Sequence, residues 1–141
     1  MPVVTWTEIQ NFTVPAGDLT APWLLVVETI RGASHLQITA TGQWTAMAGL
    51  LGVCGPDGLA GLALPADRIV LPEAPPAALI GRIGGSSASL KTDSAFVVGR
   101  NCVVPVPTGS IGPLFVSFNI TARPISIQTL NVIVSGATPT I

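Results

Sequence analysis

Residues able to carry out acid–base or nucleophilic chemistry are scarce in this sequence. His35 is the single histidine. A Ser-His-Asp centre would need it beside an activated serine, but none of the serines lies in a G-x-S-x-G motif. The histidine occupies a polar position of the alternating segment 35–41, which favours an exposed strand residue. We therefore expect no catalytic residues and a protein that is not an enzyme.

Carboxylates are dispersed along the chain, at Glu8, Asp18, Glu28, Asp57, Asp67, Glu73 and Asp93. Strands could bring any two of them together as a glycosidase pair, but the sequence singles out no two. Asp57, Asp67 and Glu73 share one segment, yet they are ten and six residues apart with prolines between them. A calcium loop concentrates its oxygen ligands. We expect no cofactor and no bound metal, calcium included.

Other chemistry-bearing motifs are incomplete. Cys54 and Cys102 have neither zinc nor redox spacing. Reduced thiols are the expectation, and a disulfide between the two cysteines stays open. The glycine-rich stretch 81–86 lacks the Lys-Ser/Thr of a phosphate-binding loop. Tryptophans at positions 6, 23 and 44 could stack on a sugar, but a core role is expected for at least two of them.

The elements that must position these residues are strands. Thirteen prolines and fifteen glycines interrupt the chain, and Val, Ile, Thr and Leu cluster in short runs between them. Expected strands are 3–7, 12–14, 23–29, 35–41, 78–83, 95–99, 102–106, 113–120 and 125–135. Leu36, Ile38 and Ala40 alternate with polar residues and share one face, and Leu130, Val132 and Val134 lie opposite Asn131, Ile133 and Ser135. The pattern predicts one all-β domain over residues 1–141, a β-sandwich or jelly roll of about eight or nine antiparallel strands.

The charge content is unusually low for a soluble domain. Only 9% of residues are Asp, Glu, Lys or Arg, against roughly 25% in ordinary domains. Segment 49–76 is apolar and should form one long irregular loop. Its candidate interface residues are Leu50, Leu51, Leu59, Leu62, Leu64, Ile69 and Leu71. We expect this segment either to cap its own sandwich or to pack on other protein, in a homo-oligomer or a larger assembly.

The same composition argues against several partners and compartments. A net charge of −1, with its few basic residues spread out, is unlike the clustered basic face that nucleic acid needs. Pro105, Pro107 and Pro113 interrupt the longest uncharged stretches, so no membrane insertion is expected. The N-terminal residues lack the basic and apolar regions of a signal peptide, which predicts synthesis in the cytoplasm.

Three stretches, 36–44, 77–85 and 106–119, resemble the small bacterial galactose-binding lectins of the PA-I-like family, which have a jelly-roll fold. Order and spacing agree over roughly residues 20 to 136. The resemblance implies a sugar site with calcium after the last of these stretches. Asn119 matches the Asn of the family's Asn-Asp pair, but Ile120 stands at the Asp position and the polar group that follows is missing. The resemblance therefore implies a lectin-like scaffold without its calcium-dependent site.

Two functions follow from these observations. The first is a non-enzymatic structural subunit of an oligomeric assembly, for which a virion decoration (cement) or tail or adhesion component would suit a small, charge-poor chain. The alternative is a calcium-independent carbohydrate-binding module. Its candidate sugar-contacting residues are Trp44, Asp57, Glu73 and Asn119, with Trp23 as a second choice of stacking platform.

Overall fold

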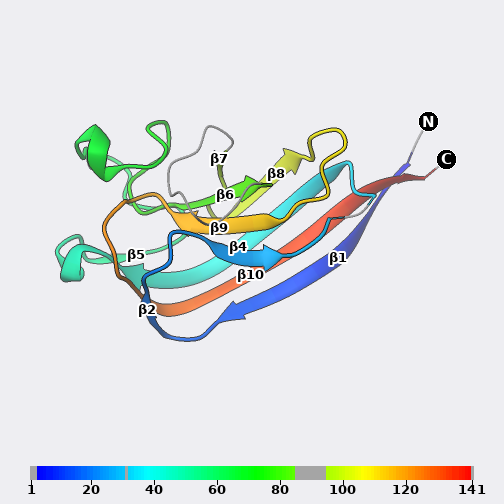
Figure 1. Cartoon of the computed structure of the whole chain (residues 1–141). Coiled ribbons are helices and arrows are strands. Elements are labelled where there is room, and N and C mark those ends of the chain that lie inside the picture. Colours follow the sequence, from blue (N-terminus) through cyan, green and yellow to red (C-terminus); the bar gives the residue numbers. More distant parts are fainter. Residues whose placement is uncertain (1–2, 31, 85–94, 141) are drawn as a thin grey trace.

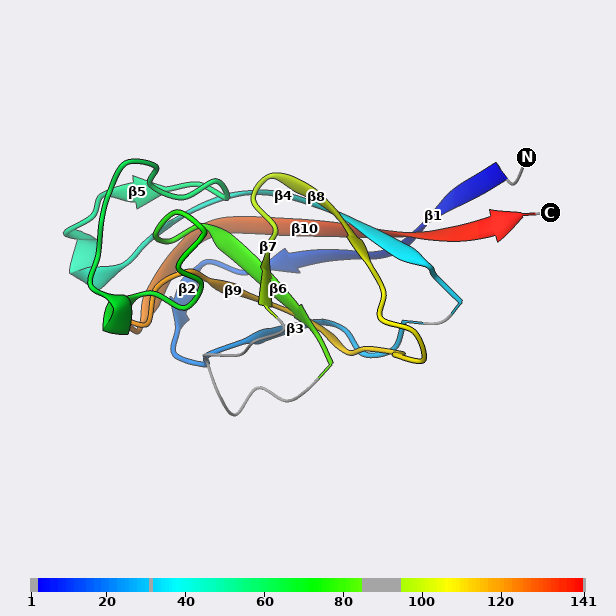
Figure 2. The same ribbon diagram turned by 90° about the horizontal axis from the view of Figure 1, so that it is seen from above.

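The computed structural model describes residues 3–30, 32–84 and 95–140, which form two antiparallel sheets packed face to face (Figures 1 and 2). The larger sheet has the order β1(Val3–Val14), β10(Ile125–Thr140), β4(His35–Thr45) and β5(Val53–Cys54), with β2(Gly17–Leu19) beside β10 and β8(Asn101–Pro105) beside β4. The smaller sheet has the order β3(Leu24–Val27), β9(Leu114–Phe118), β6(Leu79–Ile83) and β7(Ala95–Val97). This architecture confirms the predicted all-β sandwich.

Period-two alternation decides which side chains enter the core. Leu36, Ile38 and Ala40 of β4 are buried, and so are Leu130, Val132 and Val134 of β10. These two strands pair along most of their length, with Val132 opposite Ala40. Buried side chains on the same face of paired strands give one continuous apolar surface, which packs on β9 and β6 of the other sheet.

Trp44 is the largest of the fully buried side chains in the described residues. It is fully buried and meets Phe118 edge to face, with ring centroids 4.7 Å apart. Its indole nitrogen donates a hydrogen bond to the carbonyl of Ala77 over 3.0 Å, so its polar atom is satisfied. The prediction that tryptophans serve as core residues is confirmed for Trp44 and Trp23, whereas Trp6 is 43% exposed.

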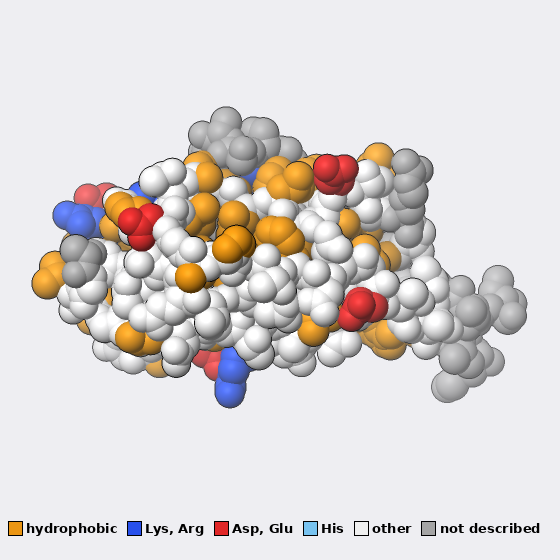
Figure 3. All heavy atoms as spheres, turned by 90° about the horizontal axis from the view of Figure 1, so that it is seen from below, with side chains coloured by type: hydrophobic (Ala, Val, Ile, Leu, Met, Phe, Trp, Pro, Cys, Tyr) orange, Lys and Arg blue, Asp and Glu red, His pale blue; other side chains and the backbone are white. Residues whose placement is uncertain are grey.

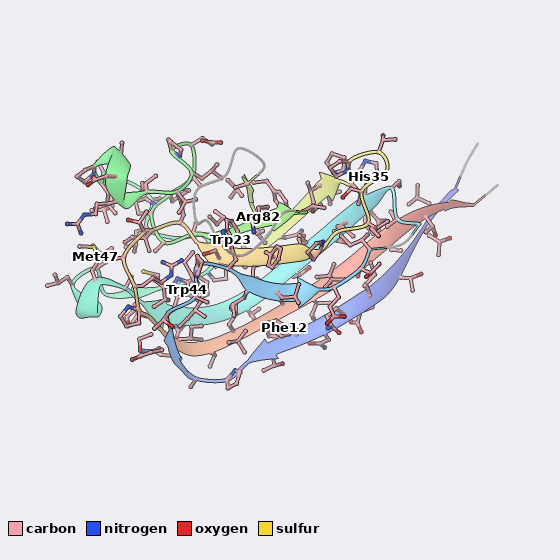
Figure 4. The ribbon with its side chains drawn as sticks, in the orientation of Figure 1. Phe12, Trp23, His35, Trp44, Met47 and Arg82 are labelled. Atoms are coloured by element: carbon pink, nitrogen blue, oxygen red, sulfur yellow. The ribbon has the colours of Figure 1, made fainter. Side chains whose placement is uncertain are left out.

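A second, smaller core lies against the outer face of the smaller sheet. It contains Trp23, Val70, Leu71, Ala74, Ile80 and Phe115. The guanidinium of Arg82 lies 4.6 Å from the Trp23 ring centroid and 4.9 Å from that of Phe115 (Figure 4). Burial lowers the pKa of Arg82. The cation–π contacts offset part of the cost of removing this cation from water.

The expected strands differ from the structure in number and in length. The segments 3–7 and 12–14 belong to one strand, β1, because residues between them keep pairing with β10 around a bulge between Glu8 and Gln10. Two short strands, β2 and β5, lie in segments that sequence patterning left irregular. The described residues thus form ten strands, against the eight or nine predicted.

Segment 49–76 is partly ordered, and its last part, from Ile69 on, packs on its own domain while much of the rest is exposed. It contains β5 and a 3₁₀ turn at Ala66–Arg68. A second 3₁₀ turn, Met47–Gly49, lies at its start. Ile69 and Leu71 are buried within this chain, as the capping alternative expects, so their assignment to an interface with other protein is wrong. Leu51, Leu59 and Leu64 pack partly against the main core. Leu50 and Leu62 remain exposed.

Both cysteines are free thiols in the structure. Burial raises the pKa of the Cys54 thiol and raises that of Cys102 to about 11, against which a backbone hydrogen bond at Ile38 acts. The thiolate is the reactive form, and its population at pH 8 is therefore small at both positions.

We predict that the native protein reacts slowly with Ellman's reagent at pH 8, because both thiols stay protonated and shielded. In urea the same sample should release two equivalents of thionitrobenzoate rapidly, one for each cysteine. Rapid labelling of the folded protein would contradict the burial of these thiols, and no labelling of the unfolded protein would indicate a disulfide.

Candidate functional site

One end of the sandwich holds the turn between β9 and β10 and the side chains that bind it. Residues 119–124 join β9 to β10 there, beside the start of β2, the end of β4 and the long segment 49–76 (Figure 1). This is the end to which the lectin resemblance assigns calcium and sugar. Here the side chains of Asn119 and Arg123 form hydrogen bonds to the backbone of neighbouring segments.

Asn119 is fully buried and binds the backbone of the long segment from both ends of its amide. Its Oδ1 accepts a 2.7 Å hydrogen bond from the N–H of Leu71. Its Nδ2 lies 3.0 Å from each of three carbonyl oxygens, those of Leu71, Ala74 and Pro75. The amide is saturated by the chain itself. The prediction that Asn119 contacts sugar is therefore wrong in this structure.

Arg123 holds the same turn against the loop before β3. Its Nη1 donates to the carbonyls of Ile120 and Ala122, and its Nη2 donates to Pro22 and to the hydroxyl of Ser117. Its Nε donates to the carbonyl of Ala21. A guanidinium has five N–H donors, so these contacts occupy all of them. Burial lowers the pKa of Arg123 to about 10.

A pocket of about 410 Å³ opens beside this turn. It is lined by Asp18 of β2, Thr45 of β4, Met47, and the residues Arg123, Pro124 and Ser126. The carboxylate can accept hydrogen bonds, the two hydroxyls can donate or accept them, and Met47 and Pro124 form an apolar wall. Because the donors of Arg123 are already used, it contributes positive charge and a fixed position rather than a free hydrogen bond to a ligand.

The predicted sugar-contacting residues do not meet in the structure. Trp44 and Asn119 are buried in the core, so Trp44 cannot stack on a sugar at the surface (Figure 4). Asp57 is exposed and forms a 2.6 Å ion pair with Arg100. Glu73 is exposed on a separate hollow formed by residues of the long segment itself. Asp93 lies outside the described residues.

Sequence reasoning missed the pocket residues because no motif joins them. Asp18 lies on a strand of three residues that the sequence did not predict, and Ser126 comes from the opposite end of the chain. β2 and β10 become neighbours only through long-range pairing, in which Asp18 stands opposite Ser126. In the sequence, the carboxylate of Asp18 was the one feature that could have indicated this pocket, and nothing set it apart from the other carboxylates.

Within the described ranges, no three His, Cys, Asp or Glu residues are placed to share a metal ion. His35 is exposed, and its Nδ1 lies 3.1 Å from the hydroxyl of Ser34. In the same part of the chain, none of the helical segments has the length and apolarity required to span a bilayer.

No protein-family model matches the sequence, and no curated protein matches it. Among solved structures, the fold is similar to one described as "EclA N-terminal domain; PllA-like lectin". The two chains are 15% identical, with a TM-score of 0.56 over 92% of this chain and 97% of the other. The likeness shows that this chain has a lectin-like β-sandwich fold.

We predict that Asn119→Asp destabilises the fold by about 3 kcal/mol or more at pH 7, because a carboxylate oxygen would replace the amide N–H groups facing three carbonyls. Burial raises the pKa of such a carboxyl, so its native form binds the proton more tightly than the unfolded chain does. The loss should therefore shrink as the pH falls toward about 4. Urea unfolding at both pH values measures it.

Asn101→Asp is the matched control, because Asn101 is exposed and its amide accepts only a 3.4 Å hydrogen bond from Gln37. Its free energy of unfolding should change by less than about 0.5 kcal/mol. Equal stability of the two variants would show that Asn119 does not anchor the long segment.

Proposed function

We propose that this chain is a non-catalytic carbohydrate-binding domain that binds sugar without calcium in the pocket lined by Asp18. The observation that carries the proposal is the mixture of groups in this pocket, a carboxylate and two hydroxyls beside an apolar wall. A sugar presents hydroxyl groups at its edge and C–H groups on its face. The lectin-like fold supports the same class of ligand.

The pocket matches such a ligand in size and rigidity. Small-molecule sites usually measure about 300–1,000 Å³, and this pocket has about 410 Å³. Arg123 fixes the turn that contributes Pro124 and Ser126, so little side-chain or loop freedom remains to be lost on binding. Asp18 can accept hydrogen bonds from sugar hydroxyls directly, and charge-assisted hydrogen bonds of this kind are strong. A bridging calcium ion is then unnecessary.

We predict that calorimetric titration with monosaccharides, chosen from a glycan array, gives millimolar or tighter binding that a chelator does not change. Asp18→Asn should weaken this binding at least tenfold, since a neutral amide accepts a weaker hydrogen bond than a carboxylate. Glu73→Gln is the matched control, because Glu73 is exposed and lies on a different hollow. It should leave the affinity unchanged.

Three results would contradict the proposal. Absence of binding to any glycan on the array would remove the function. Loss of binding when a chelator is added would show that the sugar site requires calcium. Loss of binding in Glu73→Gln with retention in Asp18→Asn would move the site to the hollow of the long segment.

A second candidate function, a subunit of an oligomeric assembly, is favoured by the exposed leucines of the long segment. Leu50 is 81% exposed and Leu62 is 39% exposed, and both line one shallow apolar hollow with Leu51 and Leu59. Leucines so exposed are suited to contact with other protein. Association with a virion stays a prediction from composition.

For this second function we predict that the double variant Leu50→Asp, Leu62→Asp lowers the weight-average mass in concentrated solution while the β circular dichroism stays unchanged. The control is Ile111→Asp, because Ile111 is 57% exposed but lies in the loop before β9. An unchanged mass in the double variant would exclude self-assembly through these leucines.

A further inference from the structure

β1 is an open edge of the larger sheet. Among the described strands it pairs only with β10 and stands at the end of the sheet order. In Figure 1 it is the outermost ribbon along the lower side of the molecule. Its side chains from residue 4 to residue 11 are exposed on both faces. Alternate backbone N–H and C=O groups of such a strand point away from its one neighbour and are available to another strand.

This edge lacks most of the features that protect edge strands. β1 has twelve residues, with no Lys, Arg or Pro among them, and Glu8 is its one charged residue. Val4 is 49% exposed and Trp6 is 43% exposed. β8, on the other side of the sheet, is protected in the usual ways, since it is short, ends at Pro105 and follows Arg100. The contrast within one sheet indicates that β1 is built for pairing.

Only the first part of β1 is free to pair. The register shifts between Glu8 and Gln10, which interrupts the strand. Beyond the bulge, Gln10 donates through Nε2 to the carbonyl of Val26 in β3 over 3.3 Å and so ties β1 to the smaller sheet. A groove lined by Ile9, Phe12 and Leu25 together with the polar Gln10, Glu28 and Thr29 lies at this junction. Figure 3 views the molecule from below, the side along which β1 runs in Figure 1. The uninterrupted open edge is therefore Val4 to Glu8, with Trp6 at its centre.

We propose that a second copy of this chain pairs antiparallel with this edge, about a two-fold axis that passes close to Trp6. An antiparallel pair of identical strands satisfies both open edges with the same groups. Trp6 then meets Trp6 of the partner, an aromatic pair at the centre of the contact. The symmetric pairing uses up the β1 edge of each copy, so it closes as a dimer and does not propagate as a fibre.

The charges on β1 are compatible with this pairing. Glu8 lies two residues from Trp6, so the two Glu8 side chains would be separated by four residue steps along the paired strands. At roughly 3.4 Å per residue this is about 14 Å, which exceeds the Debye length of about 8 Å at physiological ionic strength. The repulsion between these two carboxylates is therefore screened.

The dimer would also leave both pockets of the proposed sugar site open. β2, which carries Asp18, lies at the opposite end of the molecule from the first residues of β1 (Figure 1). The two Asp18 pockets would thus lie at the far ends of the dimer. This consequence rests on the proposed function, and it gives a weak sugar site a second point of attachment on a multivalent surface.

Light scattering after size exclusion tests the pairing. At about 100 μM the protein should have twice the chain mass of 14.4 kDa. Val4→Lys with Trp6→Lys should reduce the mass to that of one chain, because lysines on an edge oppose strand addition. The control Val103→Lys, on the exposed and already protected strand β8, should remain a dimer.

Tryptophan fluorescence of the wild-type protein gives a second measurement of dimerisation, which does not depend on whether a variant folds. Trp6 is exposed, whereas Trp23 and Trp44 are 3% and 0% exposed. Dilution should therefore shift the emission to the red as Trp6 becomes solvated, and Trp6→Phe should abolish this shift. A single-chain mass for the wild type at 100 μM, growth into fibres, or dissociation by Val103→Lys alone would overturn the proposal. Sugar binding by the lysine variant would still report separately on the Asp18 pocket.

Discussion

The amide of Asn119 is the interaction on which one end of this sandwich depends. The buried side chain of Asn119 binds the backbone of the long segment at Leu71, Ala74 and Pro75. Leu71 and Ala74 in turn cover Trp23 and Phe115 on the outer face of the smaller sheet. Release of the amide would expose that second core to water and would free the apolar segment.

The turn between β9 and β10 is organised by its own side chains. Ile120 is fully buried where the resemblance places an acidic calcium ligand, and the neighbouring Asn119 faces inward. Arg123 then closes the turn with five hydrogen bonds from its guanidinium. A guanidinium fixed to backbone carbonyls does the organising work of a cation, because it orients several oxygen atoms around one positive charge. These hydrogen bonds hold the wall of the neighbouring pocket that Arg123, Pro124 and Ser126 form.

Sequence patterning predicted the parts of the fold that repeat with period two. The burial of Leu36, Ile38 and Leu130 follows from alternation, because a strand in this fold covers one apolar face. It did not predict β2, which has three residues and no pattern of its own and forms only because β10 offers it an edge. The pocket depends on that pairing, so Asp18 could not be distinguished from six other carboxylates. The prediction that Trp44 stacks on a sugar was wrong, because residue type alone does not distinguish a buried ring from an exposed one.

A titration followed by two-dimensional nitrogen–proton NMR tests the central claim, sugar binding without calcium beside Arg123, most directly. Monosaccharide would be added to labelled protein in excess chelator, and the backbone amide shifts would be followed by residue. Binding in the pocket should give concentration-dependent shifts that centre on Asp18, Thr45 and Ser126, with the signals of residues 60–64 unmoved. Shifts confined to the long segment, or no shifts at saturating sugar, would contradict it.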